Sequence, residues 1–213
     1  MDYLALLVFE IWSLGFMSQR MHLLFLNFLL RVLKSKKWTV VVYSLIFLPG
    51  TFIHELSHLV TAQILGVPTG PLNLLPSATE GEIRLGSVSV ARSGMVSRFL
   101  IGTAPFLVGA GLMFGFIYFL AGDSIDLNIW VLILGWYVVF ELANTMFLSR
   151  SDLEGAWGVI VLIIGILITG WIFGFGWGLG EGEIVGQIVR LWSQFLLVPI
   201  GIQFVLIIIL RFI

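Results

Sequence analysis

The chain has 213 residues, of which 59% are hydrophobic and 11% are charged, with a formal net charge of -1. A soluble globular domain carries about 25% charged residues, so this composition excludes an ordinary soluble domain and predicts an integral membrane protein. The charge balance and the absence of an extended basic run argue against a nucleic-acid partner. The chain contains no cysteine, which excludes disulfides and thiolate ligands and leaves His, Asp and Glu to hold any metal.

The first apolar stretch, Tyr3 to Leu33, predicts one long tilted helix or a span followed by an interfacial helix. Polar residues recur along it every seven residues, as one stripe of a helix would require, at Ser13, Arg20, Asn27 and Lys34. We expect its histidine, His22, to lie at the membrane interface rather than to bind a metal. No basic n-region or small-residue cleavage site marks a signal peptide, so we expect the stretch to be retained.

The second apolar segment, residues 38–66, contains His54, Glu55 and His58 in the pattern H-E-x-x-H. Residues four apart lie on one face of a helix, so the two imidazoles can converge on one metal ion. The pattern is typical of zinc hydrolases, in which the glutamate acts as general base. Ionisable side chains inside an apolar span cost free energy unless they are paired or coordinated, which favours a membrane-embedded metal site over a packing cluster.

Pro49 lies one turn before the first histidine of this motif. It removes a backbone donor and frees the carbonyl of Leu45, so a kink is expected there. Broken helices are tolerated in membranes where they line a cavity, and a cavity would admit the water that hydrolysis consumes.

Residues 67–95 form the one long polar connection and are rich in Pro and Gly. Apolar residues alternate with polar ones on both sides of Gly86 and Ser87, namely Ile83, Leu85, Val88 and Val90. The alternation predicts a β-hairpin with a two-residue turn, with an ordinary connecting loop as the alternative. The exposed edge of such a hairpin would bind an extended substrate peptide through backbone hydrogen bonds, and these four residues would contact it.

Further spans are predicted at residues 96–121, 129–148, 156–177 and 188–212. No repeat or separate soluble domain is evident, so we expect residues 1–213 to form a single polytopic domain. The expected fold class is an all-α transmembrane helical bundle of five or six spans, with a small membrane-associated β-hairpin between the second and third segments. Its parts are an N-terminal helix or helices (1–37), the H-E-x-x-H span (38–66), the loop with the hairpin (67–95) and the remaining spans (96–213).

Two histidines leave a catalytic zinc ion one protein ligand short. The remaining acidic residues within a predicted span or near a membrane boundary are Glu141, Asp152 and Glu154. We interpret Glu141, deep in its span, as a hydrogen-bonded residue of helix packing rather than a catalytic one.

From Asn144 to Gly155 the chain reads N-T-M-F-L-S-R-S-D-L-E-G. Together with H-E-x-x-H, this segment resembles the site-2 protease family of intramembrane zinc metalloproteases. In that family an N-x-x-P-x-x-x-x-D-G segment supplies an aspartate that completes the zinc site. Asn144 and Asp152 keep the eight-residue separation, whereas Phe147 replaces the proline and Leu-Glu-Gly follows the aspartate. The resemblance implies that Asp152 is the third ligand, with Glu154 as the alternative, and that Asn144 lies near the bound substrate.

The resemblance implies a zinc metalloendopeptidase that hydrolyses peptide bonds of transmembrane protein substrates within or near the bilayer. Zn²⁺ is then the expected cofactor, and transmembrane protein substrates and membrane lipids are the expected partners. We expect a multi-pass protein of a prokaryotic cytoplasmic membrane. The alternatives are another membrane zinc peptidase that acts at the interface and a non-proteolytic metal-binding protein or transporter. The sequence indicates neither the natural substrate, the membrane orientation nor the oligomeric state.

Overall fold

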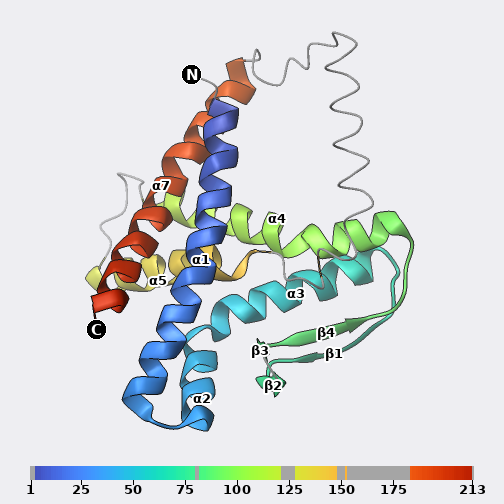
Figure 1. The fold of residues 1–213 in the computed structure, drawn as a ribbon. Coiled ribbons are helices and arrows are strands. Elements are labelled where there is room, and N and C mark those ends of the chain that lie inside the picture. Colours follow the sequence, from blue (N-terminus) through green and yellow to red (C-terminus); the bar gives the residue numbers. More distant parts are fainter. Residues whose placement is uncertain (1–2, 80–81, 121–127, 148–151, 153–182, 213) are drawn as a thin grey trace.

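The computed structural model describes residues 3–79, 82–120, 128–147, 152 and 183–212 (Figure 1). Most of this chain is helical, and a small antiparallel β element lies between the third and fourth helices. The helices are α1 (Tyr3–Leu33), α2 (Lys36–Ile46), α3 (Leu48–Ile64), α4 (Met95–Leu120), α5 (Ile129–Thr145) and α7 (Glu183–Phe212). The predicted helical class with a β element after the H-E-x-x-H segment is confirmed.

Two helices are long and apolar enough to cross a membrane, over Met95–Phe116 of α4 and Arg190–Phe212 of α7. The bent pair α2 and α3 makes a third if its two arms form one span. The 17 residues of α5 reach about 26 Å, short of the roughly 30 Å hydrocarbon core. The predicted span at 156–177 lies outside the described residues. The described residues therefore support two or three spans and do not support five or six.

α1 is one continuous helix and packs lengthwise against α7, as Figure 1 shows. Its buried residues follow one another at helical spacing on one face, namely Glu10, Leu14, Ser18, Met21 and Leu29. The hydroxyl of Ser193 on α7 donates a hydrogen bond to Glu10 Oε1 at 2.9 Å, within the buried interface. The polar pair of Glu10 and Ser193, together with Leu14 and Leu196 of one buried cluster, thus links the first and last helices.

His22 lies between the helices and contacts α2 and α5. Its Nδ1 is 2.6 Å from the Tyr43 hydroxyl on α2, and its Nε2 is 3.2 Å from the carbonyl oxygen of Asn144 on α5. The ring packs edge-on against Phe47, with 4.7 Å between the ring centroids. The partners of this imidazole come from α2 and α5, and its expected position at the membrane interface stays a prediction.

α2 and α3 are two arms bent by 68° at a break. Phe47 stands between them and is completely buried, while Pro49 lies in the first turn of α3. The kink predicted just before the histidines is therefore confirmed. Proline is accepted at this position because the first N–H groups of a helix have no helical partner.

Two side chains of α5 replace the hydrogen bond lost at the break. In a continuous helix the N–H of Gly50 would donate to the carbonyl of Ile46. Instead, the Tyr137 hydroxyl donates to the Ile46 carbonyl at 2.5 Å, and the Gly50 N–H donates to Glu141 Oε2 at 3.2 Å. Glu141 is thus a hydrogen-bonded residue of helix packing, as the sequence suggested, and it satisfies the start of α3.

The β element has four strands, β1 (Thr69–Asn73), β2 (Ser77–Thr79), β3 (Glu82–Arg84) and β4 (Ser87–Val90). β1 pairs with β4 and β2 pairs with β3, both antiparallel. Thr69 lies opposite Val90, and Thr79 lies opposite Glu82. The strands therefore form one long interrupted hairpin in which β3 and β4 follow each other along the same arm.

The prediction of a turn at Gly86 and Ser87 was wrong, because the chain reverses between β2 and β3. Gly86 serves a different purpose, since it packs against α3. A Cβ added to it would lie 2.9 Å from Thr51 Cγ2 and 3.0 Å from Glu55 Cγ. Glycine is required here by the close approach of the strand arm to the H-E-x-x-H helix.

Tyr137→Phe removes the donor that satisfies the Ile46 carbonyl at the break. We expect the free energy of unfolding to fall by about 1 kcal/mol, the usual contribution of a hydrogen bond. Denaturant unfolding of the purified protein in detergent measures the change. Tyr118→Phe is the matched control, because the Tyr118 side chain is 69% exposed and should not alter stability when its hydroxyl is lost. Equal stability of the two variants would contradict the assignment.

Candidate metal centre

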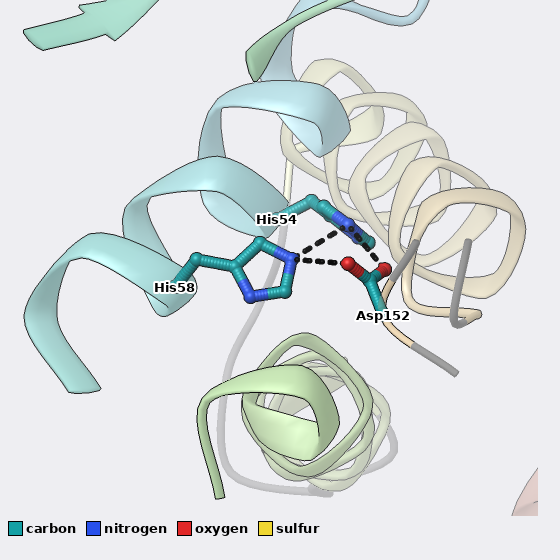
Figure 2. A group of neighbouring side chains, drawn as sticks. All are labelled: His54, His58 and Asp152. Atoms are coloured by element: carbon teal, nitrogen blue, oxygen red, sulfur yellow. Dashed lines mark hydrogen bonds and ion pairs between the residues drawn. The ribbon is translucent and has the colours of Figure 1, made fainter. Parts of the chain in front are cut away.

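His54, His58 and Asp152 converge on one point between the helices (Figure 2). The two Nε2 atoms of the histidines are 3.3 Å apart. Asp152 Oδ1 lies 3.3 Å from His58 Nε2, and its Oδ2 lies 3.6 Å from His54 Nε2. The three side chains predicted as metal ligands are therefore brought together, although 94 residues separate His58 from Asp152 in the sequence.

The spacing of these donor atoms fits a metal ion. Ligands about 2.0–2.1 Å from a tetrahedral zinc ion lie about 3.3–3.4 Å from one another, which matches the distance between the two Nε2 atoms and that from His58 Nε2 to Asp152 Oδ1. One ligand atom from each of the three residues lies within 4.8 Å of the other two. Two imidazoles and one carboxylate are also a donor set of the catalytic zinc type, in which three protein ligands leave one position open. The His54, His58 and Asp152 group could thus bind a metal ion of this size.

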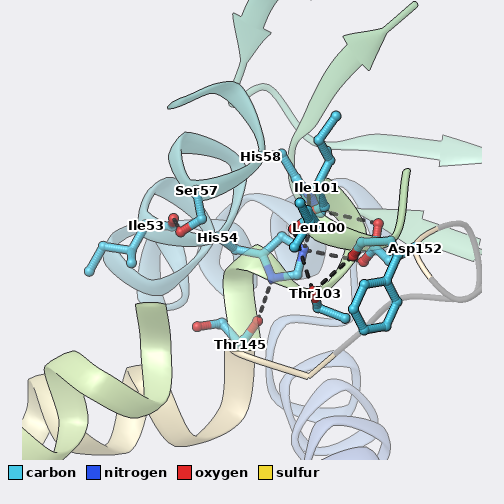
Figure 3. A network of polar contacts seen from close by, with 10 residues as sticks. Ile53, His54, Ser57, His58, Leu100, Ile101, Thr103, Thr145 and Asp152 are labelled. Carbon is cyan, nitrogen blue, oxygen red and sulfur yellow. Dashed lines mark hydrogen bonds and ion pairs between the residues drawn. The ribbon is translucent and has the colours of Figure 1, made fainter. Parts of the chain in front are cut away.

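Backbone carbonyls hold both imidazoles from behind, as Figure 3 shows. His54 Nδ1 lies 2.6 Å from the carbonyl oxygen of Thr145 on α5, and His58 Nδ1 lies 2.8 Å from that of Ile101 on α4. A carbonyl only accepts hydrogen bonds, so each Nδ1 carries a proton, and in a neutral imidazole Nε2 then presents a lone pair. Such outer partners fix the tautomer and the ring orientation of metal-binding histidines.

The resulting arrangement would attract a cation or a proton. Two imidazole lone pairs and a carboxylate all face the same small volume, where they repel one another. His54 is 13% exposed and Asp152 is 11% exposed at the side chain, so surrounding water screens this repulsion only in part. A divalent cation at the centre would convert the repulsion into three attractive contacts.

Glu55 lies beside the ligands, on the side of α3 that faces the β element. Its carboxylate is within electrostatic range of all three ligand residues, and the backbone amide of Val88 approaches it. The glutamate of the motif therefore lies between the donor group and strand β4.

Asp152 reaches the histidines because α4 carries a glycine opposite it. A Cβ at Gly102 would lie 2.8 Å from the backbone carbonyl oxygen of Asp152. The missing side chain lets the backbone at residue 152 touch α4, which sets the distance from Asp152 to α3.

Of the other ligand candidates, Glu141 does not join the group. Glu141 is on α5 and accepts a hydrogen bond from the N–H of Gly50, which lies one turn of α3 before His54. Glu154 lies outside the described residues.

The predicted substrate-binding residues have the following places. Asn144 is buried, and its amide donates to the Phe140 carbonyl at 2.7 Å and accepts from Gln203 of α7 at 2.9 Å. Ile83 lies in β3, Leu85 follows it and packs against the core around Phe47, and Val88 and Val90 lie in β4. Contact of these residues with a substrate stays a prediction.

Sequence reasoning missed the groups that position the ligands, namely the carbonyls of Ile101 and Thr145 and the glycine at position 102. Every residue has a backbone carbonyl whatever its side chain, so the sequence motif could not show which carbonyls bind the histidines. One signal was available at Pro105, which frees the carbonyl four residues earlier. The sequence does not say which donor uses that carbonyl.

Comparisons with known proteins give no match, since no protein-family model, no curated protein and no solved structure matches this chain. The site is therefore judged on its residues and geometry.

Asp152→Ala removes one of the three donors. We expect the zinc content of the purified protein to fall from about one ion per chain to near zero at micromolar zinc, because two histidines alone make an incomplete site. Atomic absorption of protein purified in detergent measures it. Glu154→Ala should keep the wild-type content. The reverse result for the two variants would make Glu154 the ligand.

Gly102→Ala should weaken metal binding without changing any ligand. The added methyl group displaces the backbone of residue 152 from α4, and shifts of this kind in the supporting shell cost about 10-fold or more in metal affinity. Competition with a zinc chelator gives the dissociation constant. Gly111→Ala on the same helix is the control, because no atom lies within 4 Å of its new Cβ. Wild-type affinity in both variants would show that Gly102 does not set the position of Asp152.

Proposed function

We propose that this protein is an intramembrane zinc metalloprotease that cleaves transmembrane protein substrates. One observation carries the proposal. One ligand atom from each of His54, His58 and Asp152 lies within 4.8 Å of the other two, and Glu55 is immediately beside them. Zinc catalysis of hydrolysis requires this combination of three protein ligands, an open position and a neighbouring general base.

The residues take distinct roles in this proposal. His54, His58 and Asp152 hold the ion, and zinc in such a site supplies the Lewis acidity that activates water near neutral pH. The Glu55 carboxylate accepts a proton from the attacking water and passes it to the amine that leaves as the peptide bond breaks. The carbonyls of Thr145 and Ile101 keep both imidazoles oriented throughout.

The surroundings of the donor group support an action inside the membrane. The histidines lie on one arm of a bent apolar helix pair, and their supporting carbonyls lie on α4 and α5. α4 is long and apolar enough to cross a bilayer. We therefore propose a multi-pass integral membrane protein, in which a peptide bond would reach the site from a substrate helix in the bilayer.

Membership of the site-2 protease family is part of the same proposal. The support is the position of Asp152, which follows Asn144 by eight residues and lies with the two histidines of H-E-x-x-H.

Strand β4 supports a role in presenting substrate. A transmembrane helix hides its peptide bonds in its own hydrogen bonds, so a substrate has to unwind before cleavage. β4 passes Glu55 closely enough for the Val88 amide to approach the carboxylate. An extended substrate segment paired beside this strand would regain hydrogen bonds next to the general base.

Glu55→Gln tests the proposed chemistry. The amide keeps the shape of the side chain but cannot take a proton, so cleavage of model transmembrane substrates should fall by at least about 100-fold. Zinc content should stay at the wild-type value, because Glu55 is not a ligand. Both quantities are measured on the same purified preparation.

Glu10→Gln provides the matched control, since Glu10 is a buried glutamate of the α1–α7 interface outside the metal group. It should retain both zinc and cleavage. An active Glu55→Gln protein would refute the general-base role. Zinc binding by the wild type without cleavage of any substrate in a broad panel would favour the non-proteolytic alternative.

A further inference from the structure

α4 contains a proline in its interior, and this proline is completely buried. Pro105 lies in the eleventh position of Met95–Leu120, so it is remote from the helix start, where proline is ordinarily accepted. In a regular helix the N–H of residue 105 would donate to the carbonyl of Ile101. Proline has no N–H, and its ring pushes against that carbonyl.

The carbonyl released by Pro105 is the one that holds a metal ligand. His58 Nδ1 lies 2.8 Å from the Ile101 carbonyl oxygen, in a buried contact between α3 and α4 (Figure 3). A proline at any other position of α4 would release a different carbonyl. The hydroxyl of Thr103 binds the two preceding carbonyls, of Phe99 at 2.8 Å and of Leu100 at 3.4 Å, and leaves that of Ile101 to the histidine.

The other ligand histidine is supported by the same kind of group. Thr145 is the last residue of α5, and the last carbonyls of a helix have no partner within it. His54 Nδ1 uses the Thr145 carbonyl at 2.6 Å. Each imidazole is thus held by a backbone carbonyl that has no partner within the helix to which the carbonyl belongs. The Thr145 carbonyl is free because α5 ends there, and the Ile101 carbonyl is free because Pro105 has no N–H.

We propose that Pro105 is a positioning residue for His58. By withholding a backbone N–H, it reserves the Ile101 carbonyl for Nδ1 of His58, which fixes the tautomer whose Nε2 faces the metal. The proposal rests on the metal site of the proposed function. A restored N–H at position 105 would draw the carbonyl back toward the α4 axis and weaken its bond to the imidazole.

The test compares two substitutions of Pro105 that differ only in one backbone group, an amide N–H or an ester oxygen. Pro105→Ala restores the N–H. Incorporation of lactic acid at position 105 gives the same methyl side chain with an ester oxygen in place of the N–H. Because both lack the proline ring, any packing defect from its loss affects both alike. Zinc affinity of the full-length protein in detergent is measured by competition with a chelator.

We expect Pro105→Ala to bind zinc about 10-fold more weakly than wild type, as typical for a lost outer-shell contact. The ester variant should bind zinc within about 2-fold of wild type, because it also lacks an N–H at position 105 and leaves the Ile101 carbonyl to His58. Pro199→Ala is the control, because Pro199 is also a buried proline inside a helix, but α7 carries none of the three ligand residues. It should leave zinc affinity unchanged.

Equal affinity of the alanine and ester variants, whether weak or at the wild-type value, would overturn the proposal, since the N–H would then have no effect. This result is distinct from failure of the proposed function. If the wild-type protein binds no zinc, the metal site itself is refuted and the role of Pro105 falls with it. If the wild type binds zinc but cleaves no substrate, the affinity comparison still decides the role of Pro105.

Discussion

A backbone N–H or carbonyl in an apolar interior has to find a partner, and this requirement shapes the centre of the molecule. Pro49 and the bend at Phe47 separate the Gly50 N–H from the Ile46 carbonyl. Gly50 is buried, so the partner of its N–H has to come from the protein itself. On α5, the Tyr137 hydroxyl donates to the Ile46 carbonyl and the Glu141 carboxylate accepts from the Gly50 N–H, and these two hydrogen bonds stabilise the bend.

The same face of α5 continues to the candidate metal site. Tyr137, Glu141 and Thr145 are four residues apart, and they bind Ile46, Gly50 and His54, which are also four apart. Each pair is separated by 91 residues in the chain, so the two stripes run in the same direction and in constant register. The contacts that stabilise the bend and the contact that orients the first histidine belong to one row. A shift of α5 along its axis would therefore disturb the bend and His54 together.

Much of the local structure could be predicted from the sequence, because it depends on neighbouring residues. The helices, the kink at Pro49 and the convergence of His54 with His58 follow from apolar periodicity, proline chemistry and four-residue spacing. The place of Asp152 came from a resemblance, and the structure brings that residue to the histidines. The strand pairing could not be predicted by the same means. The sequence pattern predicted a turn at Gly86, whereas in the structure its lack of a side chain lets the backbone approach Glu55 of α3 closely.

The polar residues inside the apolar segments divide according to their partners. His22 and Glu141 resemble the metal ligands in type and setting, yet each is bonded to a group on another helix. The Nε2 atoms of His54 and His58 instead face each other and the Asp152 carboxylate. With each Nδ1 proton directed at a carbonyl, a neutral imidazole has no proton on Nε2 to donate there. This shared orientation toward one point makes the His54, His58 and Asp152 group, and not His22 or Glu141, the candidate for binding a metal ion.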